Sequence, residues 1–181
     1  MIDALFIDPP WVIENSDNLW KNVGSRLPSL GIAYIASYLE KHSYSVKILD
    51  CNCENISILN IRKKLMQYEK PRFIGITATS ALINNALIIA RICKGAFPDA
   101  TIVMGGVHAS VMPEETLKNR FVDLVVRDEG EMTMLELISG RKYKDILGLS
   151  YRENGSIRHN PNRPLIENLD ILPFPARDLM P

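Results

Sequence analysis

Two short apolar runs of the sequence end in residues whose types suit ligand binding. Gly105 and Gly106 come directly after the run Thr101 to Met104, and Thr77 and Thr79 stand at the end of an earlier run. Adjacent glycines let a backbone approach a bulky ligand because no Cβ atom stands in the way. Threonine hydroxyls can donate to phosphate or amide oxygens. We therefore expect a binding site here, and we assign no catalytic residue.

These segments also have structural interpretations. The two glycines could form an ordinary left-handed turn, and one hydroxyl could cap the helix that follows. His108 comes two residues after the glycine pair and could touch a ligand, although a single loop histidine more often makes an ordinary hydrogen bond. Glu129 and Gly130 open a predicted helix, where carboxylates favour the positive end of the helix dipole, and they could also line a pocket.

The elements that position these residues alternate along the chain. Short apolar runs predict strands at Ala4 to Ile7, Ser45 to Leu49, Phe73 to Thr77, Thr101 to Met104 and Leu124 to Val126. Helical spacing predicts helices in 32–39, 56–68, 82–97 and 132–138, and Pro113 marks a further helix start. This alternation indicates an α/β fold with a flavodoxin-like, doubly wound, five-stranded parallel sheet in the order 2-1-3-4-5. Such sheets bind ligands beyond the carboxyl ends of the strands, here between strands one and three.

The pattern changes near residue 145. Asn154-Gly155 between two β-type runs predicts a hairpin, and five prolines in the last 22 residues predict an extended tail. We therefore divide the chain into a Rossmann-like domain over 1–145 and a hairpin and linker over 146–181. The long segment Pro9 to Ser29 has no strong helical period, and its Trp11 and Trp20 could cover a flat ligand or the core.

Composition excludes several classes of protein. The 181 residues carry 21 basic and 21 acidic side chains, so no field of one sign attracts nucleic acid. No apolar run approaches the ~20 residues of a membrane-spanning helix. Three cysteines without a C-x-x-C pair support neither disulfides nor a metal site, which favours a cytoplasmic location.

Other ligand-binding classes of this fold are also excluded. After the first strand, Asp8-Pro9-Pro10-Trp11 stands where a dinucleotide site needs a glycine-rich turn and a flavodoxin needs amide donors for phosphate. Thr77 and Thr79 stand where a phosphoacceptor receiver needs an aspartate.

The ordered set of motifs resembles one family. Asp8-Pro9-Pro10, residues 30–36, Ile74 to Thr77, Gly105 to His108 and Glu129 to Glu131 together resemble the N-terminal cobalamin-binding domain of cobalamin-dependent radical SAM proteins. Those proteins include methyltransferases and anaerobic magnesium-protoporphyrin IX monomethyl ester cyclase-like enzymes. The proline-rich tail is similar to the linker that leads to their radical SAM barrel.

The resemblance implies cobalamin as cofactor. Cobalamin-binding domains carry D-x-H-x-x-G, S-x-L and G-G after strands one, three and four. This sequence has the glycines, threonines in place of the serine, and no histidine in the first motif. The resemblance therefore implies cobalamin bound with its base detached and no histidine on cobalt. The implied cofactor-binding residues are Pro10, Gly31, Thr77, Ala78, Thr79, Gly105, Gly106, Val107, His108, Glu129 and Gly130.

Further partners follow from the same resemblance. The chain lacks the C-x-x-x-C-x-x-C cradle of the radical SAM cluster. A 4Fe-4S cluster and S-adenosylmethionine would then belong to an absent C-terminal domain of the same parent chain, and this chain alone would not be catalytic. The alternative is a domain of the same fold that has lost cobalamin and serves as a structural or interaction module.

Overall fold

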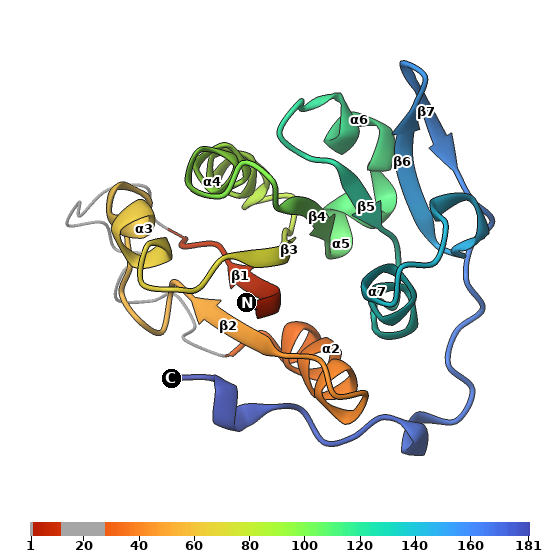
Figure 1. Ribbon diagram of the computed structural model, residues 1–181, viewed down its shortest axis with the longest axis horizontal. Helices are drawn as coiled ribbons and strands as arrows, with labels where there is room; N and C mark the ends of the chain where they lie inside the picture. The colour runs from red at the N-terminus through yellow and green to blue at the C-terminus, as the bar shows by residue number, and fades with distance from the viewer. Residues whose placement is uncertain (1, 12–27) are drawn as a thin grey trace.

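The computed structural model describes residues 2–11 and 28–181, which form one twisted sheet with helices on both faces (Figure 1). The strand order is β2-β1-β3-β4-β5-β6-β7. The parallel strands are β1 (Ile2–Asp8), β2 (Val46–Asp50), β3 (Pro71–Thr77), β4 (Thr101–Gly105) and β5 (Leu124–Val126). The antiparallel strands are β6 (Leu149–Glu153) and β7 (Ser156–His159).

Each face of the sheet carries its own apolar cluster, because successive strand residues point to opposite sides. In β1, Leu5 and Ile7 join the cluster under α3 (Ile58–Leu65) and α4 (Ile83–Ala96). Ala4 and Phe6 join the cluster under α2 (Leu30–Lys41) and α7 (Glu131–Ile138). The two short helices α5 (Val107–Val111) and α6 (Pro113–Lys118) lie between β4 and β5 along the chain. A core on both faces explains why the strands are almost continuously apolar.

The prediction of an α/β fold with a mostly parallel sheet is confirmed, with one correction. The sheet has seven strands rather than five, and it is mixed, because β6 pairs antiparallel with β5. The predicted hairpin forms at its predicted turn, where Asn154 and Gly155 both have positive φ (51° and 78°) as a type I′ turn requires. The hairpin therefore extends the main sheet, whereas the division at residue 145 stays a prediction.

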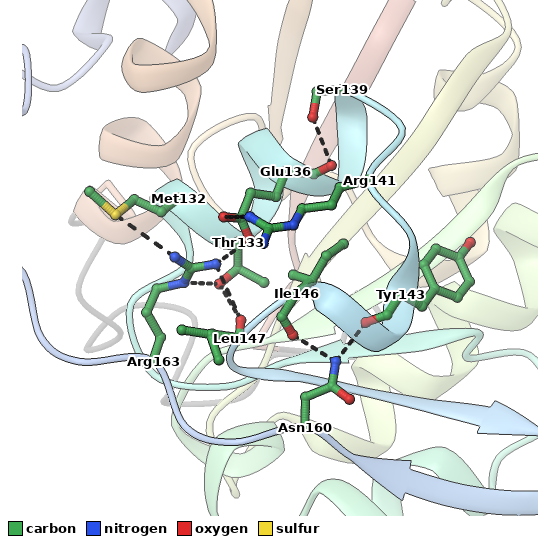
Figure 2. Close-up of polar contacts among 10 residues, drawn as sticks. All are labelled: Met132, Thr133, Glu136, Ser139, Arg141, Tyr143, Ile146, Leu147, Asn160 and Arg163. Carbon is green, nitrogen blue, oxygen red and sulfur yellow. Dashed lines mark hydrogen bonds and ion pairs between the residues drawn. The ribbon is translucent and has the colours of Figure 1, made fainter.

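The tail after β7 runs along the molecule to α2 and is extended apart from two three-residue 3₁₀ turns, Leu169–Ile171 and Arg177–Leu179 (Figure 1). Figure 2 shows one of its anchors: Arg163 donates to Thr133 Oγ1 (2.9 Å) and pairs with Glu136, both on α7. Further on, the Ala176 N–H donates to the Ala33 carbonyl of α2 (3.1 Å). The tail thus contacts both α2 and α7, the two helices that cover the same face of the sheet.

Residues 12–27 lie outside the described part of the chain, so the expectation of a long loop there and of a covering role for Trp20 stays a prediction. Trp11 is half exposed, and its backbone N–H donates to Asn52 Oδ1 (2.9 Å). Within the described ranges, no helix has the length and apolar character needed to cross a membrane.

Candidate ligand-binding site

A cavity of about 280 Å³ lies at the carboxyl ends of the central strands, between α2 and the loop that leads into α7. Its apolar lining comes from Phe6, Ile32, Ile35, Ile76, Val103, Val126 and Met134. Its glycines are Gly31, Gly75, Gly105, Gly106 and Gly130, and its polar residues are Thr77, Asp128, Glu129 and Glu131. The cavity therefore sits where the direction of chain winding reverses, which is the expected ligand position in this type of sheet.

The floor of the cavity depends on a contact between Phe6 and Gly75, which are register partners in β1 and β3. A Cβ atom at Gly75 would lie 2.4 Å from the Phe6 ring. Glycine usually weakens a strand, so its presence in the middle of β3 needs a reason. Here the missing side chain lets the aromatic ring lie over the strand.

The turn after β4 joins the end of β3 to the start of α5. The Ala78 N–H donates to the Gly105 carbonyl (3.0 Å), and the His108 N–H donates to the Ala78 carbonyl (3.1 Å). Gly106 has φ of 87°, and a Cβ atom there would lie 2.7 Å from Thr77 Oγ1 and 2.8 Å from the Ala78 carbonyl oxygen. Gly106 is thus required by the turn itself, although its ψ of −179° lies outside the left-handed region that the structural interpretation of the glycine pair supposed. A Cβ atom at Gly105 would meet only the Val126 carbonyl, at 3.7 Å, so Gly105 keeps space open in the cavity.

Three acidic residues line the cavity where the chain enters α7. Asp128 has φ of 58°, and its N–H donates to Ser110 Oγ (2.8 Å). Glu129 Oε2 accepts a hydrogen bond from the Ile166 N–H of the tail (2.7 Å). Glu131 is 9% exposed, and its Oε2 has no hydrogen-bond partner among the described residues. Burial, followed by the charge of Glu129, raises the pKa of Glu131.

Arg127, just before this acidic loop, points away from the cavity. It is buried, and its guanidinium donates to Ser150 Oγ, to the Asn160 carbonyl and to Asn162 Oδ1. Burial lowers its pKa. Arg127 therefore ties β5 to β6 and to the start of the tail.

The structure brings six of the eleven predicted site residues together around the cavity: Gly31, Thr77, Gly105, Gly106, Glu129 and Gly130. The other five are not among its lining residues. Ala78 is buried in the turn, whereas Thr79 and Val107 face solvent. The Pro10 carbonyl accepts from Asn85 Nδ2 (2.8 Å). His108 is buried, with its Nδ1 3.2 Å from Ser80 Oγ and its Nε2 without a described partner.

None of the three histidines of the sequence lines the cavity. His42 Nδ1 lies 2.8 Å from the Tyr38 carbonyl oxygen in α2, and His159 Nδ1 lies 2.9 Å from Ser150 Oγ. Within 2–11 and 28–181, no three His, Cys, Asp or Glu side chains gather so as to hold a metal ion.

A second polar group lies at the ends of β1 and β2, where Asp8 and Asp50 are register partners. Burial and the charge of Asp50 raise the pKa of Asp8 to about 6, which the hydrogen bond from Asn52 partly offsets. Burial likewise raises the pKa of Cys51, so this thiol is not an activated nucleophile.

Sequence reasoning missed Phe6, Gly75 and Glu131 as cavity residues. A glycine inside an apolar strand signals close approach of another group, and it could have indicated Gly75. Nothing in the sequence indicated that Glu131 would lack a partner while the neighbouring Glu129 bonds to the tail.

A doubly wound α/β domain with an apolar cavity at this sheet edge defines a class of ligand-binding domains. The family comparison then makes the assignment, because residues 19–138 match the model of the B12 binding domain. The chain belongs to that family.

Curated relatives include methyltransferases and a cyclase. An uncharacterized methyltransferase of Pyrococcus horikoshii is 42% identical over 88% of this chain, and the match covers 35% of that protein. The anaerobic magnesium-protoporphyrin IX monomethyl ester cyclase of Rubrivivax gelatinosus is 32% identical over 92% of this chain and 31% of that protein. The chain thus spans about a third of the length of these relatives.

Solved structures share the fold. The radical S-adenosylmethionine methyltransferase TsrM of Kitasatospora setae, with cobalamin and a [4Fe-4S] cluster bound, superposes with a TM-score of 0.74 at 18% identity. That match covers 93% of this chain and 30% of TsrM. The cobalamin-dependent radical enzyme OxsB, with aqua-cobalamin and S-adenosylmethionine bound, gives a TM-score of 0.75 at 23% identity, over 99% of this chain and 25% of OxsB.

Proposed function

We propose that this chain holds cobalamin at the carboxyl edge of its sheet, with the nucleotide arm in the cavity and no histidine on cobalt. The observation that supports this most is the cavity itself, which is apolar, bordered by glycines and free of histidine. Its volume of about 280 Å³ is at the lower end for small-molecule pockets, so it would take one arm of a large cofactor rather than the whole corrin.

The residues present fit that group. Gly105 leaves room for close approach, and Thr77 offers a hydroxyl at the same edge. Ile35, Val126 and Met134 supply apolar walls for a flat base. Bound cobalamin supplies a cobalt centre for methyl transfer or radical chemistry. The role of this chain is to bind and orient the cofactor.

We further propose that the parent protein is a radical SAM methyltransferase or an oxidative cyclase. The curated relatives with these two activities support this, as does the likeness of the fold to TsrM and OxsB. The 4Fe-4S cluster and S-adenosylmethionine would then be bound by another domain of the parent. The free cysteines of the structure are compatible with the proposed cytoplasmic location.

The test is a titration of the purified chain with hydroxocobalamin, followed by gel filtration and a visible spectrum of the protein fraction. We expect the corrin to elute with the protein and to show the spectrum of the base-off form.

Gly105→Val places methyl groups into the cavity and should weaken binding about 10-fold or more. Gly95→Val, at an exposed position of α4 with open space around it, is the matched control.

A folded wild-type chain that retains no corrin would refute the proposal. That result would favour the alternative, a domain of the same fold that serves as a structural or interaction module. Equal binding by the Gly105→Val variant would refute the placement of the arm in this cavity.

A further inference from the structure

Glu131 is the first residue of α7 and the most buried carboxylate of the cavity. Its Oε2 is buried and has no hydrogen-bond partner among the described residues. A buried polar atom without a partner costs free energy, so such atoms occur mainly where a ligand or another group completes them.

The other two carboxylates of the cavity do not share this property. Asp128 is exposed to water, and Glu129 accepts a hydrogen bond from the Ile166 N–H of the tail. The lining also includes apolar side chains from α2 and α7, among them Ile35 and Met134. Glu131 is therefore the acidic group of this wall that is buried and left with an unpartnered oxygen.

We propose that Glu131 recognises the nucleotide arm of the cofactor, because its carboxylate accepts a hydrogen bond from a hydroxyl or N–H group of that arm. This inference rests on the proposed function. The arm carries suitable donors in its ribose hydroxyls. A carboxylate also disfavours a nearby phosphate, so it orients the arm with its phosphate towards the opposite wall, where Thr77 offers a hydroxyl.

The test compares two corrinoids and three variants. Cobalamin carries the nucleotide, and cobinamide is the same corrinoid without it. Glu131→Gln keeps the shape of the side chain but removes its charge, and Glu131→Leu removes the acceptor altogether. Glu115→Gln is the matched control, since Glu115 is an exposed acidic residue in the first turn of α6. Dissociation constants are measured by spectral titration, and melting temperatures are measured without ligand.

We expect the wild-type chain to bind cobalamin more tightly than cobinamide. Glu131→Gln should weaken cobalamin binding about 10-fold, and Glu131→Leu should weaken it further, while binding of cobinamide stays unchanged. Neither variant should lower the melting temperature of the ligand-free protein, because Oε2, the atom that each variant replaces, makes no hydrogen bond in the wild-type protein. Glu115→Gln should match the wild type in every measurement.

Three results would overturn the inference. In the first, Glu131→Gln binds cobalamin as tightly as the wild type does. In the second, it weakens both corrinoids equally and lowers the melting temperature, which would indicate a structural role. In the third, the wild type binds the two corrinoids with equal affinity, which would mean that the nucleotide arm adds nothing to the affinity. A wild-type chain that binds neither corrinoid would instead refute the proposed function itself.

Discussion

Substitution of Asp8 by Asn should make the protein more stable at neutral pH and should leave it nearly unchanged in acid. Asp8 ends β1 beside Asp50, which is 1% exposed. Asp50 Oδ1 accepts hydrogen bonds from the N–H groups of Asn52 and Cys53, while its Oδ2 has no partner among the described residues. Two carboxylates at such neighbouring positions resist ionising together.

The magnitude follows from the pKa of Asp8, which burial and the charge of Asp50 raise from 3.8 to about 6. This difference corresponds to about 3 kcal/mol. Because the folded protein holds the proton more tightly than the unfolded chain, stability is lost as pH rises from 3.8 to about 6. Asn cannot ionise, and its side-chain oxygen can still accept the hydrogen bond from Asn52 Nδ2.

The assay is urea unfolding at about pH 4 and about pH 7.5, followed by circular dichroism. The free energy of unfolding of Asp8→Asn should exceed that of the wild type by about 2 kcal/mol more at the higher pH than at the lower. Asp170→Asn, at an exposed position of the tail, is the control and should show no such change. If Asp8→Asn and the wild type differed equally at both pH values, the paired-carboxylate reasoning would be wrong.

Three other perturbations have definite expected outcomes. Gly106→Ala should destabilise the fold by about 1–3 kcal/mol in urea unfolding, because φ of 87° and the close turn disfavour a Cβ atom; unchanged stability would contradict this. Arg163→Ala should cost about 1–3 kcal/mol through its lost bonds to α7, whereas the control Arg158→Ala, at an exposed pair, should cost less than about 1. Iodoacetamide should modify the buried Cys51 and Cys93, whose pKa values burial raises, only after unfolding, as mass spectrometry can test; rapid labelling of the native protein would contradict the structure.

The sequence predicted the sheet and its helices well because their signals are local. Apolar runs and helical spacing are set by which residues face the core, so α4 could be placed from the stripe that includes Ile89 and Cys93. The turn at Asn154 was equally clear. The pairing of β6 with β5 was not predicted, because a turn signal does not say which strand the hairpin will join.

The site was predicted only in part, for a similar reason. Residues that directly follow strands, such as Thr77 and Gly105, lie at the cavity because the sheet edge places them there. Thr79 does not, because the chain turns outward within two residues of the strand end. Which carboxylate of this wall is paired depends on the tail, because the Ile166 N–H, 37 residues further along the chain, donates to Glu129. Contacts between residues so far apart in the chain cannot be predicted from the local spacing of residue types.

The contact between Phe6 and Gly75 couples two positions that lie 69 residues apart in the chain. A Cβ atom at 75 would lie 2.4 Å from the Phe6 ring, so a larger residue at 75 is tolerated only with a smaller one at 6. In natural variation, larger residues at position 75 should therefore occur together with smaller residues at position 6. Engineering that enlarges position 75 for an altered cofactor would likewise need both codons randomised at once, since a single substitution at 75 would meet the Phe6 ring.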